Sequence, residues 1–233
     1  LDALCSLAAW RMEQIGKPEL VPFFADLVYC YAPWLYNLPA SERSHHARPW
    51  GLLIHSVEAV ERAVAVGLGT SPGLSTDWAR TTLALALYHD AGRLLDLQVT
   101  NPSGRTWDPF QDSLWTFCRD GGVTYRWLPG RGLNRHEYRA PELFRVFLPD
   151  SAKPLLPLLD QAWYAYLNRD RFSPDILGLY PVWVAGIAAW ADQRSAEDDR
   201  YARKKAARQV PKAAARPPVY YDASPASTRK EAP

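Results

Sequence analysis

The feature that most constrains this chain is an apolar helical run that ends in a histidine and an aspartate. A helix is predicted from about Asp77 to Ala91, with Ser75 or Thr76 as its N-cap. Its segment 83–87, Leu-Ala-Leu-Ala-Leu, is apolar on every side, which predicts a central, buried helix. The pair 89–90, His-Asp, therefore lies at the buried end of a core helix.

Two further residues with metal-binding side chains lie on apolar helical faces. His55 lies on the apolar face of a helix predicted over 51–66, and Asp192 lies on the alanine-lined face of a helix predicted over 181–194. An ionised Asp90 is costly in a buried helix without a partner, and a bound cation supplies that partner. Two histidines and two carboxylates form a mixed nitrogen and oxygen site. Such a site suits Mn²⁺ first, and also Fe, Mg²⁺ or Ni²⁺, better than a thiolate-loving metal.

Each of these residues also has an ordinary interpretation when it is taken alone. A lone His55 fits a hydrogen-bonded core histidine, and the dipeptide of His89 and Asp90 is common. A lone Asp192 fits a helix-terminal carboxylate that faces water. Their order, H…HD…D on three separate apolar faces, favours the metal site over these readings.

The composition excludes several other classes of protein. The cysteines are odd in number and form no CxxC pair, so neither a disulfide framework nor a thiolate zinc site is expected, and a reducing compartment fits. No apolar run reaches membrane-spanning length, and the N-terminus lacks a basic region followed by an apolar core. We therefore expect a cytoplasmic protein without membrane insertion.

The pattern of apolar residues predicts an all-α helical bundle over 1–195 and a basic tail over 196–233. Helices are expected over 4–15, from 21 to a break near Pro33, over 51–66, 77–91, near Leu114, from near Pro141, over 155–167 and over 181–194, and no strand is predicted. The tail holds nine Lys/Arg and five Asp/Glu, and Ala, Pro, Lys and Arg dominate it. Because this composition cannot bury a core, we expect a frayed helical extension followed by disorder.

Three sequence runs resemble a known family. They are SERSHHARPWGLLIHSVEAVERA from Ser41, ALALYHDAGRLLDLQVT from Ala84 and WLPGRGLNRHEY from Trp127. Together they resemble the TraI_2 domain of the HD superfamily, which forms the N-terminal part of MobH-type conjugative relaxases. The resemblance covers most of 21–195. It implies an HD-type bundle whose metal is held by His55, His89, Asp90 and Asp192.

The resemblance also implies a role in bacteria, where the domain would process DNA for conjugative transfer or for excision of integrative elements. Two departures from the family pattern stand out. Arg93 follows the His-Asp pair where many HD proteins carry lysine, and arginine can bind phosphate in a forked geometry. Family members commonly show two glycines where 49–51 reads Pro-Trp-Gly, which predicts a stiffer loop before the helix of His55.

Three further histidines have two interpretations each. His136 either helps to hold a second metal ion, as extra histidines do in some HD enzymes, or is a loop histidine that contacts substrate or backbone. The site is therefore expected to hold one or two ions. His45 and His46 either contact a ligand or phosphate in the site or are structural loop residues, and His46 is the stronger candidate of the two.

A basic stretch with interleaved aromatic residues surrounds His136. Arg131, Arg135 and Tyr138 belong to it, and such a stretch can follow a phosphate backbone and stack bases, or it can be a solvated loop. Tyr138 is expected to pack or hydrogen-bond rather than act as a nucleophile. The relaxases that use tyrosine carry a His-hydrophobic-His metal motif, and that motif does not occur here.

These features predict a metal-dependent phosphohydrolase that acts on DNA, as a single strand or at a transfer origin, together with the conjugation machinery. In this hypothesis a metal-activated hydroxide attacks phosphorus, Asp90 orients the water, and Arg93 stabilises the phosphoryl charge. No G-x-x-x-x-G-K-[ST] loop occurs, so no ATPase motor is expected. The alternatives are hydrolysis of small nucleotides and a non-catalytic module that binds DNA or a protein partner.

Overall fold

The computed structural model describes residues 2–70, 73–129, 135–169 and 178–209, and this part of the chain is mainly helical. Its α-helices are α1 (Asp2–Gln14), α2 (Leu20–Tyr31), α3 (Gly51–Arg62), α4 (Thr76–Tyr88), α5 (Leu114–Phe117), α6 (Arg135–Leu143), α7 (Leu156–Leu167) and α9 (Leu179–Gln209). The predicted all-α class is confirmed. Among the described residues no helix is long and apolar enough to cross a membrane.

Helix α4 is the centre of the bundle, as its sequence predicts. It packs against α2, α3, α7 and α9, and every residue from Thr81 to Gly92 is buried. The Ser75 side chain accepts a hydrogen bond from the backbone N–H of Trp78 and so caps the helix. Aromatic rings fill the core beside it, among them Tyr31, whose ring stacks on that of Phe147 with centroids 4.5 Å apart.

The prediction that the chain has no strand is wrong in one place. Strand β1 (Leu97–Thr100) pairs antiparallel with β2 (Thr124–Trp127), with Leu97 opposite Trp127. Four residues are too few to show a period of two in the sequence, so the pairing depends on tertiary contacts. The helix expected from near Pro141 is α6, which already begins at Arg135.

Two helices end differently from the prediction. Helix α4 ends at Tyr88, and residues 91–96 form a 3-10 turn. Helix α3 ends at Arg62 and continues as a short π-helix, Ala63–Gly67. Both changes lie near a glycine where another segment packs closely. An added Cβ at Gly67 would lie 2.5 Å from the side chain of Ile187 in α9, and one at Gly92 would lie 1.8 Å from the carbonyl oxygen of His136 in α6.

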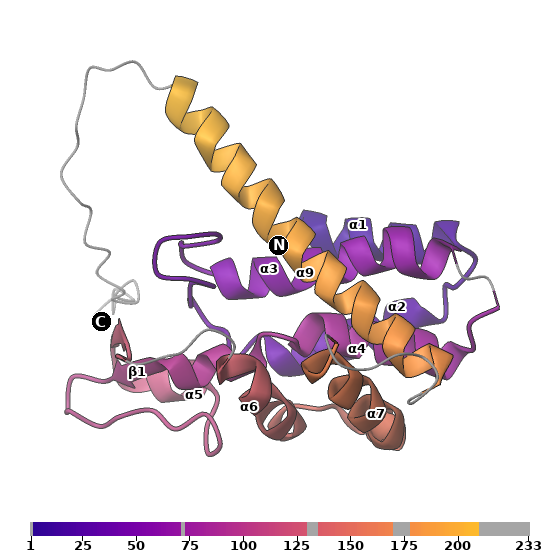
Figure 1. Cartoon of the computed structure of the whole chain (residues 1–233). Helices are drawn as coiled ribbons and strands as arrows, with labels where there is room; N and C mark the ends of the chain where they lie inside the picture. Colours follow the sequence, from indigo (N-terminus) through magenta and orange to yellow (C-terminus); the bar gives the residue numbers. More distant parts are fainter. Residues whose placement is uncertain (1, 71–72, 130–134, 170–177, 210–233) are drawn as a thin grey trace, which may run out of the picture.

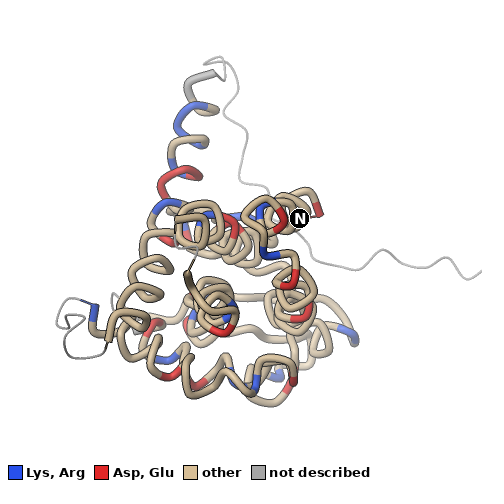
Figure 2. The backbone as a smooth tube through the Cα atoms, turned by 90° about the vertical axis from the view of Figure 1, so that its right-hand side faces the viewer, with Lys and Arg blue, Asp and Glu red and all other residues tan. Residues whose placement is uncertain are grey.

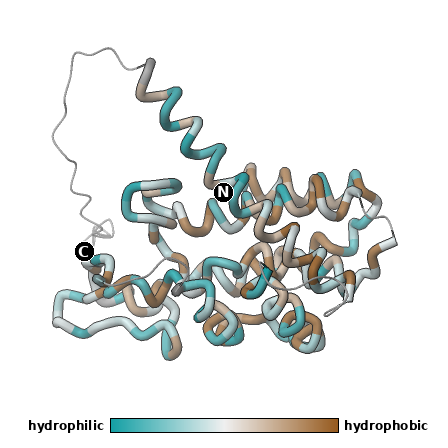
Figure 3. Tube along the Cα trace, viewed as in Figure 1, coloured by the Kyte–Doolittle hydropathy of each residue, from teal (hydrophilic) through white to brown (hydrophobic). Residues whose placement is uncertain are grey.

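Helix α9 runs through the predicted domain boundary at 195–196 without a break. It crosses α3 and packs on α3, α4 and α7, and its C-terminal half projects from the body of the bundle (Figure 1). Figure 2 shows that this projecting half carries Lys and Arg together with Asp and Glu, and Figure 3 shows that it is far more hydrophilic than the bundle. Ion pairs such as Arg194 with Asp198 support it. The predicted disordered tail after 209 lies outside the described residues.

Candidate metal centre

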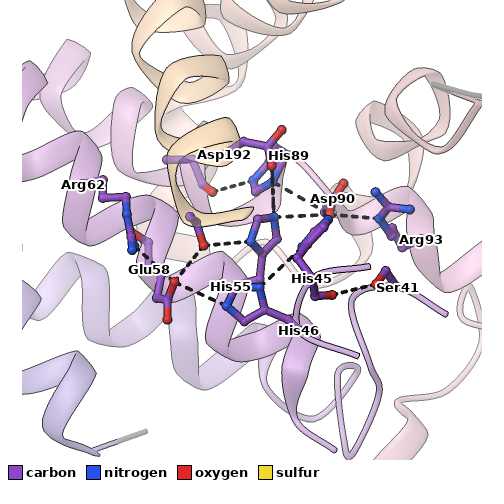
Figure 4. A network of polar contacts seen from close by, with 12 residues as sticks. Ser41, His45, His46, His55, Glu58, Arg62, His89, Asp90, Arg93 and Asp192 are labelled. Atoms are coloured by element: carbon purple, nitrogen blue, oxygen red, sulfur yellow. Dashed lines mark hydrogen bonds and ion pairs between the residues drawn. The ribbon is translucent and has the colours of Figure 1, made fainter. Parts of the chain in front are cut away.

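Four side chains from three helices meet at the centre of the bundle. His55 comes from α3, His89 and Asp90 follow the end of α4, and Asp192 comes from α9 (Figure 4). The Nε2 atom of His55 lies 3.3 Å from Nε2 of His89, 3.1 Å from Oδ1 of Asp192 and 3.6 Å from Oδ2 of Asp90. Oδ1 of Asp192 lies 3.4 Å from Nε2 of His89. The structure therefore brings the four predicted ligands together, and we call them the helix-borne group.

The end of α4 aims the histidine and the aspartate into this point. His89 is the C-cap of α4, and its Nδ1 lies 2.8 Å from the carbonyl oxygen of Ala86. A carbonyl only accepts, so Nδ1 carries the proton of this bond and Nε2 faces His55. Asp90 leaves the helical conformation and is 3% exposed, whereas the Asp192 side chain is 27% exposed. Solvent therefore reaches the group from the side of Asp192.

The buried carboxylates dominate the electrostatics of the group. Burial alone would lower the pKa of His89, but the charges of Asp192 and Asp90 outweigh burial and raise it to about 9. Burial alone would raise the pKa of Asp90, but Arg93, His89 and His136 hold it well below its usual range. The pKa of Asp192 is lowered in the same way, against burial, mainly by His89 and His55. The group holds two ionised carboxylates and requires positive charge beside them.

This donor set fits a cation that accepts nitrogen and oxygen ligands. Ligand atoms of His55, His89 and Asp90 lie within 4.8 Å of one another, and all three residues are buried. Without metal, the imidazolium of His89 supplies the positive charge at this point. A divalent cation can replace that proton and meet the same carboxylates.

Arg93 and His136 hold the two oxygens of Asp90. Nε of Arg93 lies 3.0 Å from Oδ2, and Nε2 of His136 lies 3.2 Å from Oδ1, the oxygen turned away from His55. Helix α6 can approach this closely because residue 92 is glycine: an added Cβ there would lie 1.8 Å from the carbonyl oxygen of His136. His136 thus contacts the group through Asp90, which leaves both of its predicted roles open.

His45 and His46 form a second group of imidazoles, the loop-borne pair, on the other side of His55. Their Nδ1 atoms lie 3.4 Å apart, and their ring centroids lie 4.8 Å and 5.1 Å from that of His55. Together with His55 they make a second set that could hold a metal. Burial and the neighbouring His55 lower the pKa of His45 to about 4, so its ring is neutral near pH 7.

The second half of α9 helps to hold the loop of this pair. The backbone N–H of His46 donates to Oδ2 of Asp199 at 2.8 Å, and the Arg203 guanidinium donates to the carbonyl oxygen of Ser44. The backbone of His46 (φ 47°) and Trp50 (φ 62°) is left-handed, which is costly for residues with a Cβ. Residues beyond the predicted domain boundary thus contact the loop of the candidate site.

The comparison with protein families decides the classification. The family model of TraI_2, described as "Putative helicase", matches residues 8–139, more than half of the chain. The chain belongs to the TraI_2 family. This confirms the family predicted from the three sequence runs. Comparisons with curated proteins and with solved structures found no match.

The TraI_2 match includes His55, His89, Asp90 and His136 but ends before α9. The structure adds two polar residues that the sequence analysis missed. Glu58 lies three residues after His55, and Ser195 lies three residues after Asp192. Spacing of three on a helix places each beside its neighbour on one face, which was the available signal.

Of the remaining predicted residues, one is exposed on α6 and two have side chains outside the description. Tyr138 lies on α6 with its side chain 61% exposed. Arg135 begins α6, but the placement of its side chain lies outside the description, and Arg131 lies outside the described residues. The predicted basic and aromatic surface near His136 is therefore untested and stays a prediction.

Proposed function

We propose that this TraI_2 domain is a metal-dependent phosphohydrolase that cleaves DNA phosphodiester bonds during conjugative transfer or processing of integrative elements. The observation that carries the proposal is the meeting of His55, His89, Asp90 and Asp192 around one buried point. These four residues would hold the ion, with Mn²⁺ the first choice over Fe, Mg²⁺ and Ni²⁺. When bound, such a cation lowers the pKa of a coordinated water and so supplies a hydroxide nucleophile near neutral pH.

The chain's own residues would position and neutralise the substrate. Arg93 uses its Nε on Asp90, and the same planar guanidinium carries further N–H groups that suit phosphoryl oxygens. Its side chain is 20% exposed, beside the ion site. In the proposal Arg93 would bind phosphate, while Asp90 would hold the ion and orient the attacking water by accepting a hydrogen bond from it.

Residues around the loop-borne pair support a nucleic-acid substrate. Arg43, Arg48 and Trp50 are exposed and flank the buried His45 and His46. Cationic and aromatic side chains together suit a phosphate backbone with stacking bases. The family description names a helicase, but the sequence contains no G-x-x-x-x-G-K-[ST] loop, so we propose no ATP-driven motor in this chain. The proposed role places the domain in the bacterial cytoplasm with the conjugation machinery.

One experiment separates this function from its alternatives. The purified chain is loaded with Mn²⁺ and assayed on transfer-origin DNA, on single-stranded oligonucleotides and on a panel of nucleotides. We expect nicking or hydrolysis of DNA that His89→Ala and Asp90→Ala abolish. Cleavage of nucleoside phosphates alone would replace DNA with a small-nucleotide substrate. DNA binding without cleavage by any divalent metal, unchanged in Asp90→Ala, would establish a binding module instead.

The nucleophile can be checked in the same assay. Tyr138→Phe is expected to keep full activity, because this exposed side chain lies on α6 and the proposed nucleophile is hydroxide. If the variant binds metal normally yet loses all activity, the reaction uses a covalent tyrosine and the hydroxide mechanism is wrong.

A further inference from the structure

A chain of hydrogen bonds links the candidate ligand His55 to two residues outside the helix-borne group. The Ser195 hydroxyl of α9 lies 2.8 Å from Oε2 of Glu58 and 2.9 Å from Nδ1 of His55. Ser195 is fully buried, and so is His55. A hydroxyl without access to water must find its partners here, so the direction of each bond can be derived.

The direction follows from the number of protons. A carboxylate only accepts, so the single proton of the Ser195 hydroxyl goes to Glu58. The Ser195 oxygen is then left as an acceptor for His55, and Nδ1 of His55 must carry the proton of that bond. Nε2 of His55 therefore carries a lone pair, and it faces His89 and Asp192 at 3.3 Å and 3.1 Å.

The opposite tautomer is also available at this position. With the proton on Nε2, His55 would donate to Oδ1 of Asp192 at 3.1 Å and would have no lone pair to offer a cation. In that form Nδ1 and the Ser195 oxygen would face each other without a proton between them, and nothing else at that contact supplies one. In the Nδ1–H form the unprotonated contact is the one between Nε2 and Asp192, where the His89 imidazolium or a bound cation supplies the positive charge. We propose that Ser195 and Glu58 are positioning residues that hold His55 in the tautomer able to bind metal. This inference rests on the proposed metal-dependent function.

Glu58 is itself held in place for this task. Arg62, one turn later on α3, lies 3.2 Å from Oε2 of Glu58 and also pairs with Asp198 of α9 at 3.0 Å. The same Oε2 lies 3.3 Å from Nε2 of His46. Glu58 thus contacts both His46 of the loop-borne pair and Ser195, which bonds to His55. In this proposal α9 provides two residues: Asp192 as a ligand and Ser195, three residues later, as the group that orients His55.

The test measures metal binding in the full chain. Affinity for Mn²⁺ is determined by titration calorimetry for wild type, Ser195→Ala, Ser195→Thr and Glu58→Gln. Loss of an outer partner of a metal-binding histidine typically weakens affinity about 10- to 100-fold, and we expect this for Ser195→Ala. Ser195→Thr keeps the hydroxyl, so its Mn²⁺ affinity should stay within about 3-fold of the wild-type value.

Ser56→Ala is the matched control. Ser56 is adjacent to His55 on α3 and is also fully buried, but its hydroxyl has no hydrogen-bond partner among the described residues. It should bind Mn²⁺ as wild type does. Thermal unfolding of each metal-free variant establishes that it is folded before its affinity is compared.

Two further measurements distinguish positioning from general support of the fold. In metal-free protein, ¹⁵N-resolved NMR of the histidine rings should place the His55 proton on Nδ1 in wild type and on Nε2 in Ser195→Ala. Glu58→Gln should weaken affinity less than Ser195→Ala and should add almost nothing in the double variant, because it acts through Ser195.

The outcomes are separable. A folded Ser195→Ala variant that binds Mn²⁺ as tightly as wild type, or fully additive effects of the two variants, would overturn the positioning role alone. A wild-type chain that binds no divalent metal would overturn the proposed function as well. A tautomer change with the predicted loss of affinity, restored in Ser195→Thr, supports the assignment.

Discussion

Burial acts on two histidines of this site in the same direction, yet their pKa values move apart. The pKa of His89 rises to about 9, whereas that of His45 falls to about 4. Both rings lie beside His55, with Nε2 of His89 3.3 Å from Nε2 of His55 and the His45 centroid 4.8 Å from the His55 centroid. The difference is the carboxylates. Asp192 and Asp90 outweigh burial at His89, while burial and His55 dominate at His45.

This contrast separates the two groups by charge. The helix-borne group concentrates negative charge in a buried space, where the His89 imidazolium or a bound cation can balance it. The loop-borne pair consists of buried imidazoles next to that space, with His45 neutral near pH 7. We therefore interpret the first group as the ion site and the second as contacts for the ligand or for the loop.

The largest expected effect comes from removing a member of the helix-borne group. His89→Ala and Asp90→Ala should abolish both Mn²⁺ binding and hydrolysis. This loss is larger than the roughly 10- to 100-fold loss of metal affinity expected when an outer partner of a ligand is removed. Calorimetry and a DNA cleavage assay measure the two effects, and circular dichroism checks the fold. Retained tight Mn²⁺ binding in His89→Ala would remove this residue from the ion site.

Arg93→Ala should have the next largest effect, and it should separate turnover from binding. Loss of a group that stabilises developing charge costs about 10²- to 10³-fold in kcat, and the Arg93 guanidinium is placed for that role beside Asp90. Metal affinity should fall less than kcat, by at most the roughly 10- to 100-fold expected for losing an outer partner of Asp90. Arg93→Lys, which keeps the charge but not the fork, should recover part of the rate. An Mn²⁺ affinity that falls as far as kcat would make Arg93 a support for Asp90 rather than a phosphate contact.

Variants of the loop-borne pair should have a moderate effect. We expect His45→Ala to lower kcat/KM by about 10-fold, equivalent to about 1.4 kcal/mol, with Mn²⁺ affinity close to wild type. The comparison of the two groups breaks down if His45→Ala loses Mn²⁺ as completely as His89→Ala, because His45 would then be a ligand.

The last prediction concerns the pH dependence of stability in metal-free protein. Because the pKa of His89 is raised, this residue increases the free energy of unfolding below about pH 6.5. That contribution is lost as the pH rises towards about 9. The lowered pKa of His45 has the opposite effect on the pH dependence. Its contribution to the free energy of unfolding is present above about pH 6.5 and is lost as the pH falls towards 4.

Urea unfolding across this pH range, with EDTA present, tests both signs. His89→Gln should flatten the alkaline limb and His45→Gln the acid limb. An alkaline limb that is unchanged in His89→Gln would contradict the charge assignment of the helix-borne group.

The sequence by itself determined the helical class, the central helix and the family. A five-residue segment that is apolar on every side has only the core as its place, so Leu83–Leu87 predicted the buried α4. The motif order predicted which side chains would meet, because ligands on apolar faces must point inwards. Periodicity failed at short features, because β1 and β2 are four residues each. The predicted helical extension after 195 is present as the second half of α9, which ends the description at Gln209.

Only the tertiary structure decided how the centre is completed. Ser195 and Glu58 are 137 residues apart, and no local pattern predicts a bond between them. Whether His136 contacts Asp90 depends on α6 crossing Gly92, and whether His46 is held depends on Asp199 of the projecting helix. Hydrogen bonds in a buried centre are set by which helices cross there. The crossing is a property of packing between faces distant in sequence, which local propensity does not encode.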